Sequence, residues 1–405
     1  MDAGQRIVVA GGSLAGHSAV AELLISAPAS DVVWITGEEH RAYSKPALSK
    51  EFMQARNDVA DLTLPGIDGS EPRLRVIAGR QCVSLDAAAR SVTLSDGETL
   101  GFDQLLIATG ANARMPAMLR GIPGVFPLRT LDDAVAIRSR LSARPKVLVV
   151  GGGLIGCELA ASMRTLGLDV TLAERLPSLL DRPFGGALSA YFQQLHERNG
   201  VRLHMDVAVE SVAMEGGTAT GATLSDGTVV EAGLVLVGAG SEPATGWLNG
   251  SGIALSDGIV CDSFLATSHP GIHAAGDVAR WLNPIYDLPM RVEHWTNASA
   301  QGRAAARNIA AAVTGKAELR KPFGDVPYFW SDQYGHKIQM VGWHQGHDRL
   351  EVEQPADAPG PMVKFYRNGA LIAAAGVNMP RVIMRLRRQI EDEARASGPQ
   401  YANVS

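Results

Sequence analysis

The stretch Arg6-Ile7-Val8-Val9-Ala10-Gly11-Gly12-Ser13-Leu14-Ala15-Gly16 decides how this chain begins to fold. Its β-branched start is typical of a strand buried in a parallel sheet. The glycines predict a tight turn into a helix, from His17 to about Ser26, and a second strand follows from Asp31 to Thr36. Glu38 comes next. This order of strand, glycine turn, helix, strand and acid is typical of a dinucleotide-binding unit.

Each part of this unit has its own task in binding a dinucleotide. Glycines let the backbone approach the pyrophosphate, the helix N-terminus supplies a positive dipole, and the acid accepts hydrogen bonds from ribose hydroxyls. Ser13 replaces the second glycine of the usual pattern, and its small side chain still permits a close approach. We therefore expect a first nucleotide site that includes Gly11, Ser13, Leu14, Ala15, Gly16 and Glu38.

The same order of features recurs in the second quarter of the chain. A strand from Lys146 to Val150 leads into the complete fingerprint Gly151-Gly152-Gly153-Leu154-Ile155-Gly156. A helix carrying Glu158 follows, and the next strand ends at Glu174, which lies 174 − 156 = 18 positions after the last glycine. Glycine turns without a ligand are the alternative interpretation, but two complete units favour two nucleotide sites. A flavin dinucleotide with a nicotinamide dinucleotide is the common combination.

Length and composition limit the class of protein. A chain of 405 residues predicts two to three domains at roughly 150 residues each. The net charge of −5 argues against a nucleic-acid-binding surface, and no apolar run reaches the roughly 18 residues of a membrane span. Glycine is enriched, with 44 residues, and the motifs explain part of that excess. We expect a soluble, cytoplasmic protein, because the first strand leaves no room for a signal peptide.

Cysteine and histidine patterns exclude other kinds of chemistry. Cys82, Cys157 and Cys261 lie far apart, which argues against a disulfide scaffold and a local dithiol motif. His269 and His273 are separated by Pro-Gly, and His344 and His347 have no partners at zinc-ligand spacing. We predict no metal site.

A further acid follows a strand of small residues late in the chain. Asp277 comes directly after Ala274-Ala275-Gly276, where glycine allows close approach and a carboxylate can accept hydrogen bonds from sugar-alcohol hydroxyls. The alternative is that Asp277 caps a helix beginning near Val278.

Several motifs together resemble one family over nearly the whole chain. The chain is similar to the putidaredoxin-reductase-like group, the FAD-dependent, NADH-linked ferredoxin reductases that serve oxygenases. The segments that carry the resemblance are Tyr43 to Lys50, Ala108-Thr109-Gly110, Arg129 to Asp133, Gly151 to Glu158, Ala275-Gly276-Asp277, Arg291 to Trp295 and Tyr328 to Tyr334. The chain departs from the family at Ser44-Lys45-Pro46-Ala47 and at Ser13.

The resemblance implies an α/β fold with two Rossmann-like dinucleotide-binding domains, for FAD and NAD, and a C-terminal α+β domain. The FAD domain would comprise residues 1–110 and 235–315, where a strand beginning at Leu234 returns the chain to it. The NADH domain would be 111–234 and the C-terminal domain 316–405.

The resemblance also assigns cofactor contacts. FAD would contact the first glycine turn and a set of residues elsewhere, namely Glu38, Lys45, Lys50, the backbone near Val83, Arg129, Asp277 and Trp295. NADH would lie on the second glycine turn, at Gly151, Gly153, Ile155 and Gly156, with Glu158 near the nicotinamide and Glu174 on the adenosine ribose. Glu174 favours NADH because it would repel a 2′-phosphate, although Arg175 beside it could pair with one.

The implied reaction joins two kinds of electron carrier. Nicotinamide gives up two electrons as a hydride, a [2Fe–2S] ferredoxin accepts one at a time, and FAD converts between them. The ferredoxin would feed an oxygenase of the haem or Rieske type. The catalytic candidates are Lys50, for charge compensation, Glu158, as its ion-pair partner, and Trp330, where electrons leave. Their alternatives are a solvated loop lysine, a first-turn helix acid and a core aromatic.

Other functions stay open for a chain of this kind. It could be an NADH-binding flavoprotein that signals through partner binding, or an NADH oxidase. A disulfide or peroxide reductase would need cysteine near Tyr43 to Lys50, and none is there. The basic run of Arg381, Arg385, Arg387 and Arg388 is either a solvated helix face or a docking patch for an acidic ferredoxin.

Overall fold

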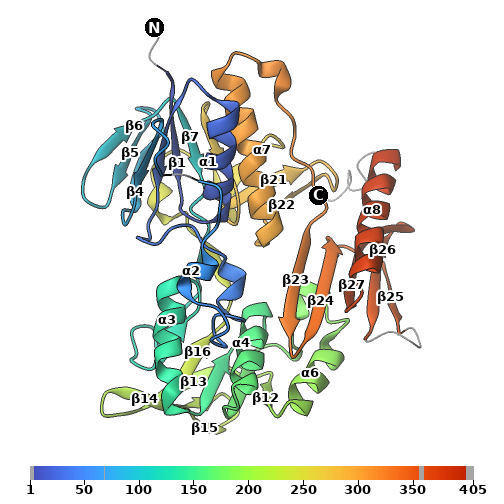
Figure 1. The fold of residues 1–405 in the computed structure, drawn as a ribbon. Helices are drawn as coiled ribbons and strands as arrows, with labels where there is room; N and C mark the ends of the chain where they lie inside the picture. Colours follow the sequence, from blue (N-terminus) through green and yellow to red (C-terminus); the bar gives the residue numbers. More distant parts are fainter. Residues whose placement is uncertain (1–3, 68, 355–359, 398–405) are drawn as a thin grey trace.

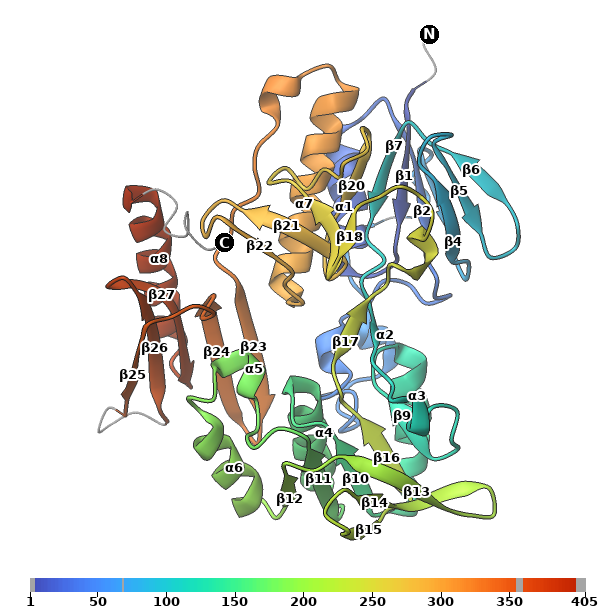
Figure 2. The same cartoon turned by 180° about the vertical axis from the view of Figure 1, so that it is seen from behind.

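The chain forms three parts, seen from opposite sides in Figures 1 and 2. The structure is a computed structural model that describes residues 4–67, 69–354 and 360–397. One part, at the top of Figure 1, combines the N-terminal blue segments with the orange helix α7. The green part below it comes from the middle of the sequence, and the red C-terminal part stands at their side.

A parallel sheet with the strand order β20-β7-β1-β2-β3 forms the centre of the first part. Ile7 to Ala10 are buried in its middle strand, as expected for a β-branched run between two neighbours. Helices α1 (Leu14–Ser26) and α7 (Trp295–Val313) pack together beside it. The strands are β1 (Arg6–Ala10), β2 (Asp31–Ile35), β3 (Leu74–Ile77), β7 (Gln104–Ile107) and β20 (Ile272–Ala274).

Two smaller sheets complete this part. One is the antiparallel set β4 (Cys82–Asp86), β5 (Ser91–Leu94) and β6 (Thr99–Gly101). The other contains β18 (Leu255–Ser256), β19 (Gly258–Cys261), β21 (Ala279–Asn283) and β22 (Leu288–Met290). The first glycine turn and the small-residue segment after β20 both follow carboxyl ends of the parallel strands, which is where open α/β sheets bind ligands.

The second part repeats this plan around the second glycine motif. Its parallel sheet has the order β12-β11-β10-β16-β9. Its strands are β9 (Val125–Pro127), β10 (Val147–Val150), β11 (Val170–Glu174), β12 (Arg202–Met205) and β16 (Leu234–Val237). The helices are α3 (Leu131–Arg140), α4 (Leu154–Thr165), α5 (Asp181–Phe184) and α6 (Ser189–Arg198). An antiparallel set adds β13 (Val209–Glu215), β14 (Thr218–Leu224) and β15 (Val229–Glu231).

The third part is an antiparallel sheet with one helix packed on it. The sheet order is β23-β24-β27-β26-β25, and α8 (Pro380–Ser397) contacts β27 and β24. The strands are β23 (Tyr328–Gln333), β24 (His336–Gly342), β25 (Arg349–Glu353), β26 (Met362–Arg367) and β27 (Ala370–Val377). This sheet with its helix is the α+β arrangement predicted for the C-terminal domain.

The prediction that Leu234 begins a strand of the first domain is wrong. β16 lies in the second sheet, parallel to β10 and β9, because its four apolar residues are buried between those strands. The chain crosses back afterwards, through β17 (Ser241–Pro243), which pairs antiparallel with β8 (Ala111–Ala113) on the outward crossing. We therefore place the second crossing near residue 240 rather than 235.

Two local expectations also differ from the structure. The first helix begins at Leu14 rather than His17, so the turn is shorter than expected. No helix follows Asp277, since the chain enters β21 at Ala279 instead. In the described part of the chain, no helix is both long and apolar enough to cross a membrane.

Candidate active site

A cavity of about 610 Å³ lies where the three parts meet. Its wall includes the first glycine turn, the start of α4 and two aromatic residues of β23, Phe329 and Trp330. Many of the predicted site residues line it, namely Gly11, Ser13, Leu14, Ala15, Glu38, Lys45, Lys50, Arg129, Ile155, Glu158, Asp277, Trp295 and Trp330. The topology thus brings together residues that are far apart in the sequence.

The first glycine turn packs closely against the end of β7 and leads directly into α1. Gly11 has φ +135°, and a Cβ there would lie 2.0 Å from the carbonyl oxygen of Ala108. The turn ends at Ser13, the N-cap of α1, whose side chain makes no capping hydrogen bond. The first amides of a 13-residue helix therefore face the cavity, where an anion would be stabilised. Gly16 sits inside α1 and lets it approach Gly11.

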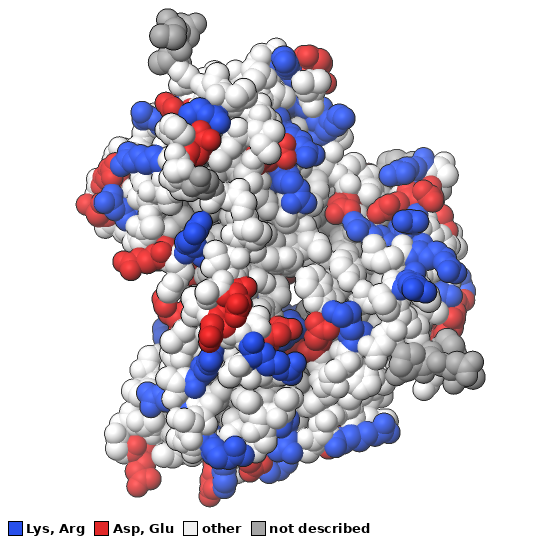
Figure 3. Space-filling view, in the orientation of Figure 1, with Lys and Arg blue, Asp and Glu red and all other residues white. Residues whose placement is uncertain are grey.

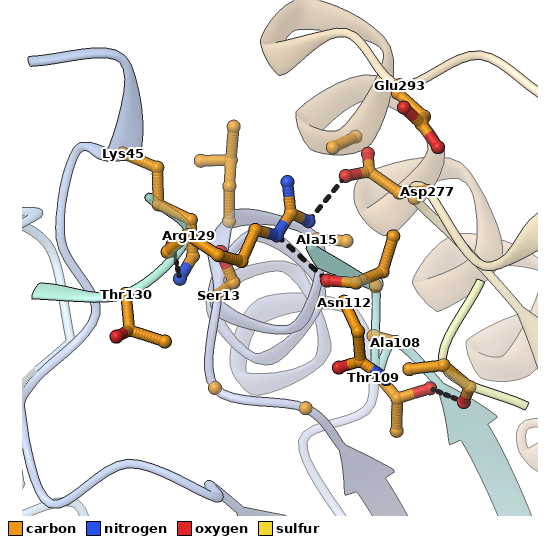
Figure 4. A pocket seen from close by; sticks show the side chains of 18 of the residues that line it. Ser13, Ala15, Lys45, Ala108, Thr109, Asn112, Arg129, Thr130, Asp277 and Glu293 are labelled. Carbon is orange, nitrogen blue, oxygen red and sulfur yellow. Dashed lines mark hydrogen bonds and ion pairs between the residues drawn. The ribbon is translucent and has the colours of Figure 1, made fainter. Parts of the chain in front are cut away.

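Arg129 and Asp277 form an ion pair across the cavity wall, as Figure 4 shows. The Arg129 Nη2 donates to Asp277 Oδ2 at 2.8 Å, and its Nε donates to the carbonyl oxygen of Ala111 at 2.8 Å. Burial alone would lower the pKa of Arg129, but Asp277, together with Glu293 and Tyr43, outweighs burial and the pKa rises. Asp277 is therefore a fixed acceptor beside α1, not a helix cap.

Glu38 lies just past the end of β2 and is already held by two donors. Tyr43 Oη donates to Oε2 at 2.6 Å, and Lys45 Nζ donates to Oε1 at 3.1 Å. Lys45 also donates to the carbonyl oxygen of Arg129 at 3.2 Å. Burial raises the pKa of Tyr43 and lowers that of Lys45. The departure from the family pattern at Lys45 thus supplies a cation that orients Glu38, the acid predicted to bind a ribose.

Val83 itself lies outside the cavity wall, and the predicted FAD contact with the backbone near it stays a prediction. Its side chain is exposed on β4, whereas its neighbour Cys82 lines the cavity. Alternating strand residues point to opposite faces, so one position separates the two environments. Burial raises the pKa of the Cys82 thiol to about 12. None of the three cysteines forms a disulfide.

The centre of the site is a buried ion pair between Lys50 and Glu158. Lys50 Nζ lies 2.9 Å from Glu158 Oε1, and both side chains are at most 10% exposed. Two further donors reach the same carboxylate: Ser49 Oγ to Oε2 at 2.5 Å and Ser331 Oγ to Oε1 at 2.7 Å. Glu158 is therefore the point at which all three parts of the chain meet. Sequence reasoning missed Ser49 and Ser331, because nothing in their local pattern indicates a carboxylate partner.

The alternatives for Lys50 and Glu158 are wrong. Lys50 is buried rather than solvated, and it also donates to the carbonyl oxygen of Pro46 at 3.0 Å. Glu158 lies beyond the first turn of α4, which begins at Leu154. It faces the cavity rather than the free amides of the helix end.

The second glycine turn lies beside the cavity. Gly151 has φ +107°, and a Cβ there would lie 2.5 Å from the carbonyl oxygen of Gly238. Gly153 is the N-cap of α4, so the helix start again has no capping side chain. Leu154 and Ile155 extend from this turn into the cavity wall. Gly151, Gly153 and Gly156 belong to the turn itself, outside the wall.

Glu174 closes the second turn. Its Oε2 accepts from the amide of Gly152, and its Oε1 accepts from the amide of Leu176 at 2.8 Å. Both oxygens keep a free lone pair, since a carboxylate oxygen can accept two hydrogen bonds. The acid is thus fixed at the position where an adenosine ribose would lie.

The aromatic segment of β23 divides between two environments. Phe329 is buried and packs against Phe184 and His294, with ring centroids 5.7 and 4.6 Å away. Trp330 is half-buried, lines the cavity and stacks on Tyr328 at 6.0 Å. Phe329 therefore belongs to the core and also reaches the cavity wall, whereas Trp330 is the more exposed of the two lining residues. Trp295, the first residue of α7, forms another part of the wall.

Sequence comparisons with known families give the class of this site. Residues 5–302 match the family described as pyridine nucleotide-disulphide oxidoreductase, and residues 328–405 match a reductase C-terminal family. The chain belongs to the pyridine nucleotide-disulphide oxidoreductase family. It is therefore an oxidoreductase, and membership of this family implies FAD and NAD(H) as its cofactors.

The relatives of this oxidoreductase cover nearly its whole length. The rhodocoxin reductase of Rhodococcus erythropolis is 31% identical over 98% of this chain and 92% of its own. The ferredoxin–NAD(+) reductase component of the p-cumate 2,3-dioxygenase system of Pseudomonas putida is 33% identical over 96% and 94%. The solved covalent putidaredoxin reductase–putidaredoxin complex matches with a TM-score of 0.90, at 30% identity over 96% and 94%. The predicted resemblance and the predicted fold class are confirmed.

Proposed function

We propose that this oxidoreductase is an NADH-dependent ferredoxin reductase, which passes electrons from NADH through FAD to a [2Fe–2S] ferredoxin. That ferredoxin would feed an oxygenase of the haem or Rieske type. The observation that carries the proposal is the buried Lys50–Glu158 pair, in a cavity wall shared by two dinucleotide-binding units. Relatives over the full chain length are reductases of rhodocoxin and of dioxygenase systems.

The residues of the first unit fit FAD. The start of α1 would bind the pyrophosphate, Glu38 the adenosine ribose, and Asp277, held by Arg129, a hydroxyl of the sugar-alcohol chain. When bound, FAD supplies the exchange between two-electron and one-electron chemistry. Lys50 provides a cation at the cavity wall, where it would offset negative charge on the reduced cofactor.

The residues of the second unit fit NADH. The start of α4 would bind its pyrophosphate and Glu174 its adenosine ribose, while Leu154, Ile155 and Glu158 direct the nicotinamide into the cavity. Hydrophobic Leu154 and Ile155 would exclude water from the reacting rings. Arg175 follows Glu174 directly, so the preference for NADH over NADPH depends on the acid.

Trp330 would form the exit for electrons, because it connects the cavity wall with the stacked Tyr328.

The basic run on α8 offers fewer free charges for docking a ferredoxin than the sequence alone indicates. Arg387 is bound to Asp325 at 2.5 Å, whereas Arg381, Arg385 and Arg388 are exposed. Figure 3 shows Lys and Arg interspersed with Asp and Glu over the C-terminal part.

Steady-state NADH consumption separates this function from its rivals. A ferredoxin reductase consumes NADH slowly alone and rapidly when a [2Fe–2S] ferredoxin and a downstream electron acceptor are added. An NADH oxidase produces peroxide at the same rate without ferredoxin. A signalling flavoprotein would keep a long-lived reduced state in complex with NAD⁺ and turn over slowly with every acceptor. Either of the last two outcomes would contradict the proposal.

A further inference from the structure

A chain of buried polar side chains leads from Glu158 away from the cavity. Ser331 Oγ donates to Glu158 Oε1 at 2.7 Å, and Gln333 Nε2 donates to Ser331 Oγ at 3.1 Å. Gln333 Oε1 is 3.1 Å from His196 Nε2, and His196 Nδ1 is 3.0 Å from Tyr334 Oη. The chain therefore joins four side chains to the carboxylate that holds Lys50.

The chemistry of these groups fixes the direction of every hydrogen bond. Ser331 has one hydroxyl hydrogen and gives it to Glu158, so it must accept from the amide of Gln333. The amide oxygen of Gln333 can only accept, so His196 carries its hydrogen on Nε2 and accepts at Nδ1 from Tyr334. All donors thus point toward Glu158, and their dipoles stabilise its negative charge.

Burial makes this arrangement specific. Ser331, Gln333 and His196 are each at most 1% exposed, so an unpaired polar atom at any of them would carry a large desolvation cost. Burial also lowers the pKa of His196 to about 4, which keeps its ring neutral and the direction of the chain intact. His196 lies on α6, whereas Ser331 and Gln333 lie on β23, so the chain joins the second and third parts.

We propose that Gln333 and His196 are positioning residues, which act through Ser331 to fix the Glu158 carboxylate where it holds Lys50 at the cavity wall. Without Gln333, the Ser331 hydroxyl is free to rotate away, and Glu158 loses one of three ordered donors. Lys50 has four rotatable bonds and stays in place because its partner is fixed. The proposal depends on the proposed function in one respect: the reaction at the Lys50–Glu158 pair is taken to be the reduction of FAD by NADH.

A double-mutant cycle separates positioning from simple packing between the parts. The variants are Gln333→Met, which is close in size and has no hydrogen-bond donor, Ser331→Ala, and their combination, all as FAD-loaded proteins. Stopped-flow absorbance gives the limiting rate of flavin reduction at saturating NADH. We expect each single change to lower this rate about five- to twentyfold, because each removes the same donor from a charged group. The double variant should be no slower than the slower single one.

Tyr334→Phe is the matched control. It removes the outermost donor and leaves the bonds between His196 and Glu158 in place, so the rate should change less than twofold. The proposal is wrong if the effects of Gln333→Met and Ser331→Ala multiply in the double variant. It is also wrong if both single variants reduce flavin at the wild-type rate. Failure of the wild type to reduce a ferredoxin would instead contradict the proposed function alone, since this half-reaction contains none.

A second measurement reads the hydrogen-bond direction directly on the wild type and requires no activity. Side-chain ¹⁵N NMR of His196, assigned with His196→Asn, should show the neutral Nε2–H tautomer and no titration above pH 5. An Nδ1–H tautomer or a protonated ring at pH 7 would reverse the chain of donors and refute it.

Discussion

Lys50 and Glu158 come from different dinucleotide-binding units, yet the Lys50 Nζ and Glu158 Oε1 lie 2.9 Å apart in the wall of one cavity. The carboxylate is further bound by Ser49 of the first unit and Ser331 of the C-terminal part. Glu158 therefore contacts all three parts of the chain. If nicotinamide binding moves this carboxylate, the contacts transmit the change to Lys50 and to the C-terminal part.

Replacing Lys50 with Ala should slow flavin reduction by NADH about ten- to hundredfold, because a preorganised charge at the reacting centre would be lost. This loss corresponds to a barrier raised by about 1.4–2.8 kcal/mol, since each factor of ten in rate is about 1.4 kcal/mol. Stopped-flow absorbance at saturating NADH measures this rate. Lys50→Arg keeps a cation and should be less impaired. The change to Ala also leaves Glu158 buried without its partner, so Lys50→Met combined with Glu158→Gln serves as the control for stability. An unchanged rate in Lys50→Ala would show that the charge has no role.

Replacing Trp330 with Ala should reduce electron transfer to ferredoxin about tenfold or more and leave flavin reduction by NADH within about twofold. The side chain lines the cavity and stacks on Tyr328, outside the residues that would bind NADH. Separate half-reactions, each followed anaerobically, give the two rates. Trp330→Phe retains an aromatic ring and should recover part of the ferredoxin rate. Equal ferredoxin rates in wild type and Trp330→Ala would remove this residue from the exit path.

Replacing Asp277 with Asn should weaken FAD retention about tenfold, since hydrogen bonds to a charged group contribute about 1.5–3 kcal/mol. Arg129 would also lose its buried partner. Flavin fluorescence after dilution measures the dissociation constant. Asp287→Asn, in the turn before β22, is a comparable surface change and should leave FAD binding unaltered.

Replacing Glu174 with Gln should narrow the preference for NADH over NADPH about tenfold, because the charge that repels a 2′-phosphate is lost. The ratio of kcat/KM for the two nucleotides measures this preference. Arg175→Ala should shift the ratio in the opposite direction. If neither change alters the ratio, the adenosine ribose lies elsewhere.

Acid should destabilise the protein partly through His273. This ring is buried on β20, and burial lowers its pKa from 6.5 to about 4. The unfolded chain binds a proton near pH 6.5 and the folded one does not, so the stability present above pH 6.5 is lost as the pH falls toward 4. Between pH 7.5 and 5 this amounts to about 2 kcal/mol. Urea unfolding of His273→Leu at both pH values should show a smaller pH dependence than the wild type.

Much of the fold was predictable, because its signals are local. The two glycine turns, their strands and the acids Glu38 and Glu174 lie within short segments whose order decides their structure. The sequence pattern places the strand at Leu234 in the wrong sheet, because a short apolar run looks the same in either parallel sheet. Its neighbours are set by distant pairing with β10 and β9, which no local pattern contains.

The site was predictable only where a residue type indicates its chemistry. Lys50 and Glu158 carry charges that need partners once they are buried, and the family resemblance paired them. Ser49, Ser331, Gln333 and His196 are ordinary polar residues in sequence, and their role depends on the meeting of three parts of the chain. The predicted contact with the backbone near Val83 stays a prediction, since its neighbour Cys82 lines the cavity and Val83 does not.

The most direct test of the proposed function mixes the NADH-reduced enzyme anaerobically with an excess of oxidised [2Fe–2S] ferredoxin. Ferredoxin and flavin absorbance are followed together in a stopped-flow instrument. We predict that each reduced flavin is reoxidised as two ferredoxin molecules are reduced, at a rate fast enough to support turnover. Flavin that stays reduced with ferredoxin present, but is reoxidised when oxygen is admitted and yields peroxide, would contradict the assignment as a ferredoxin reductase.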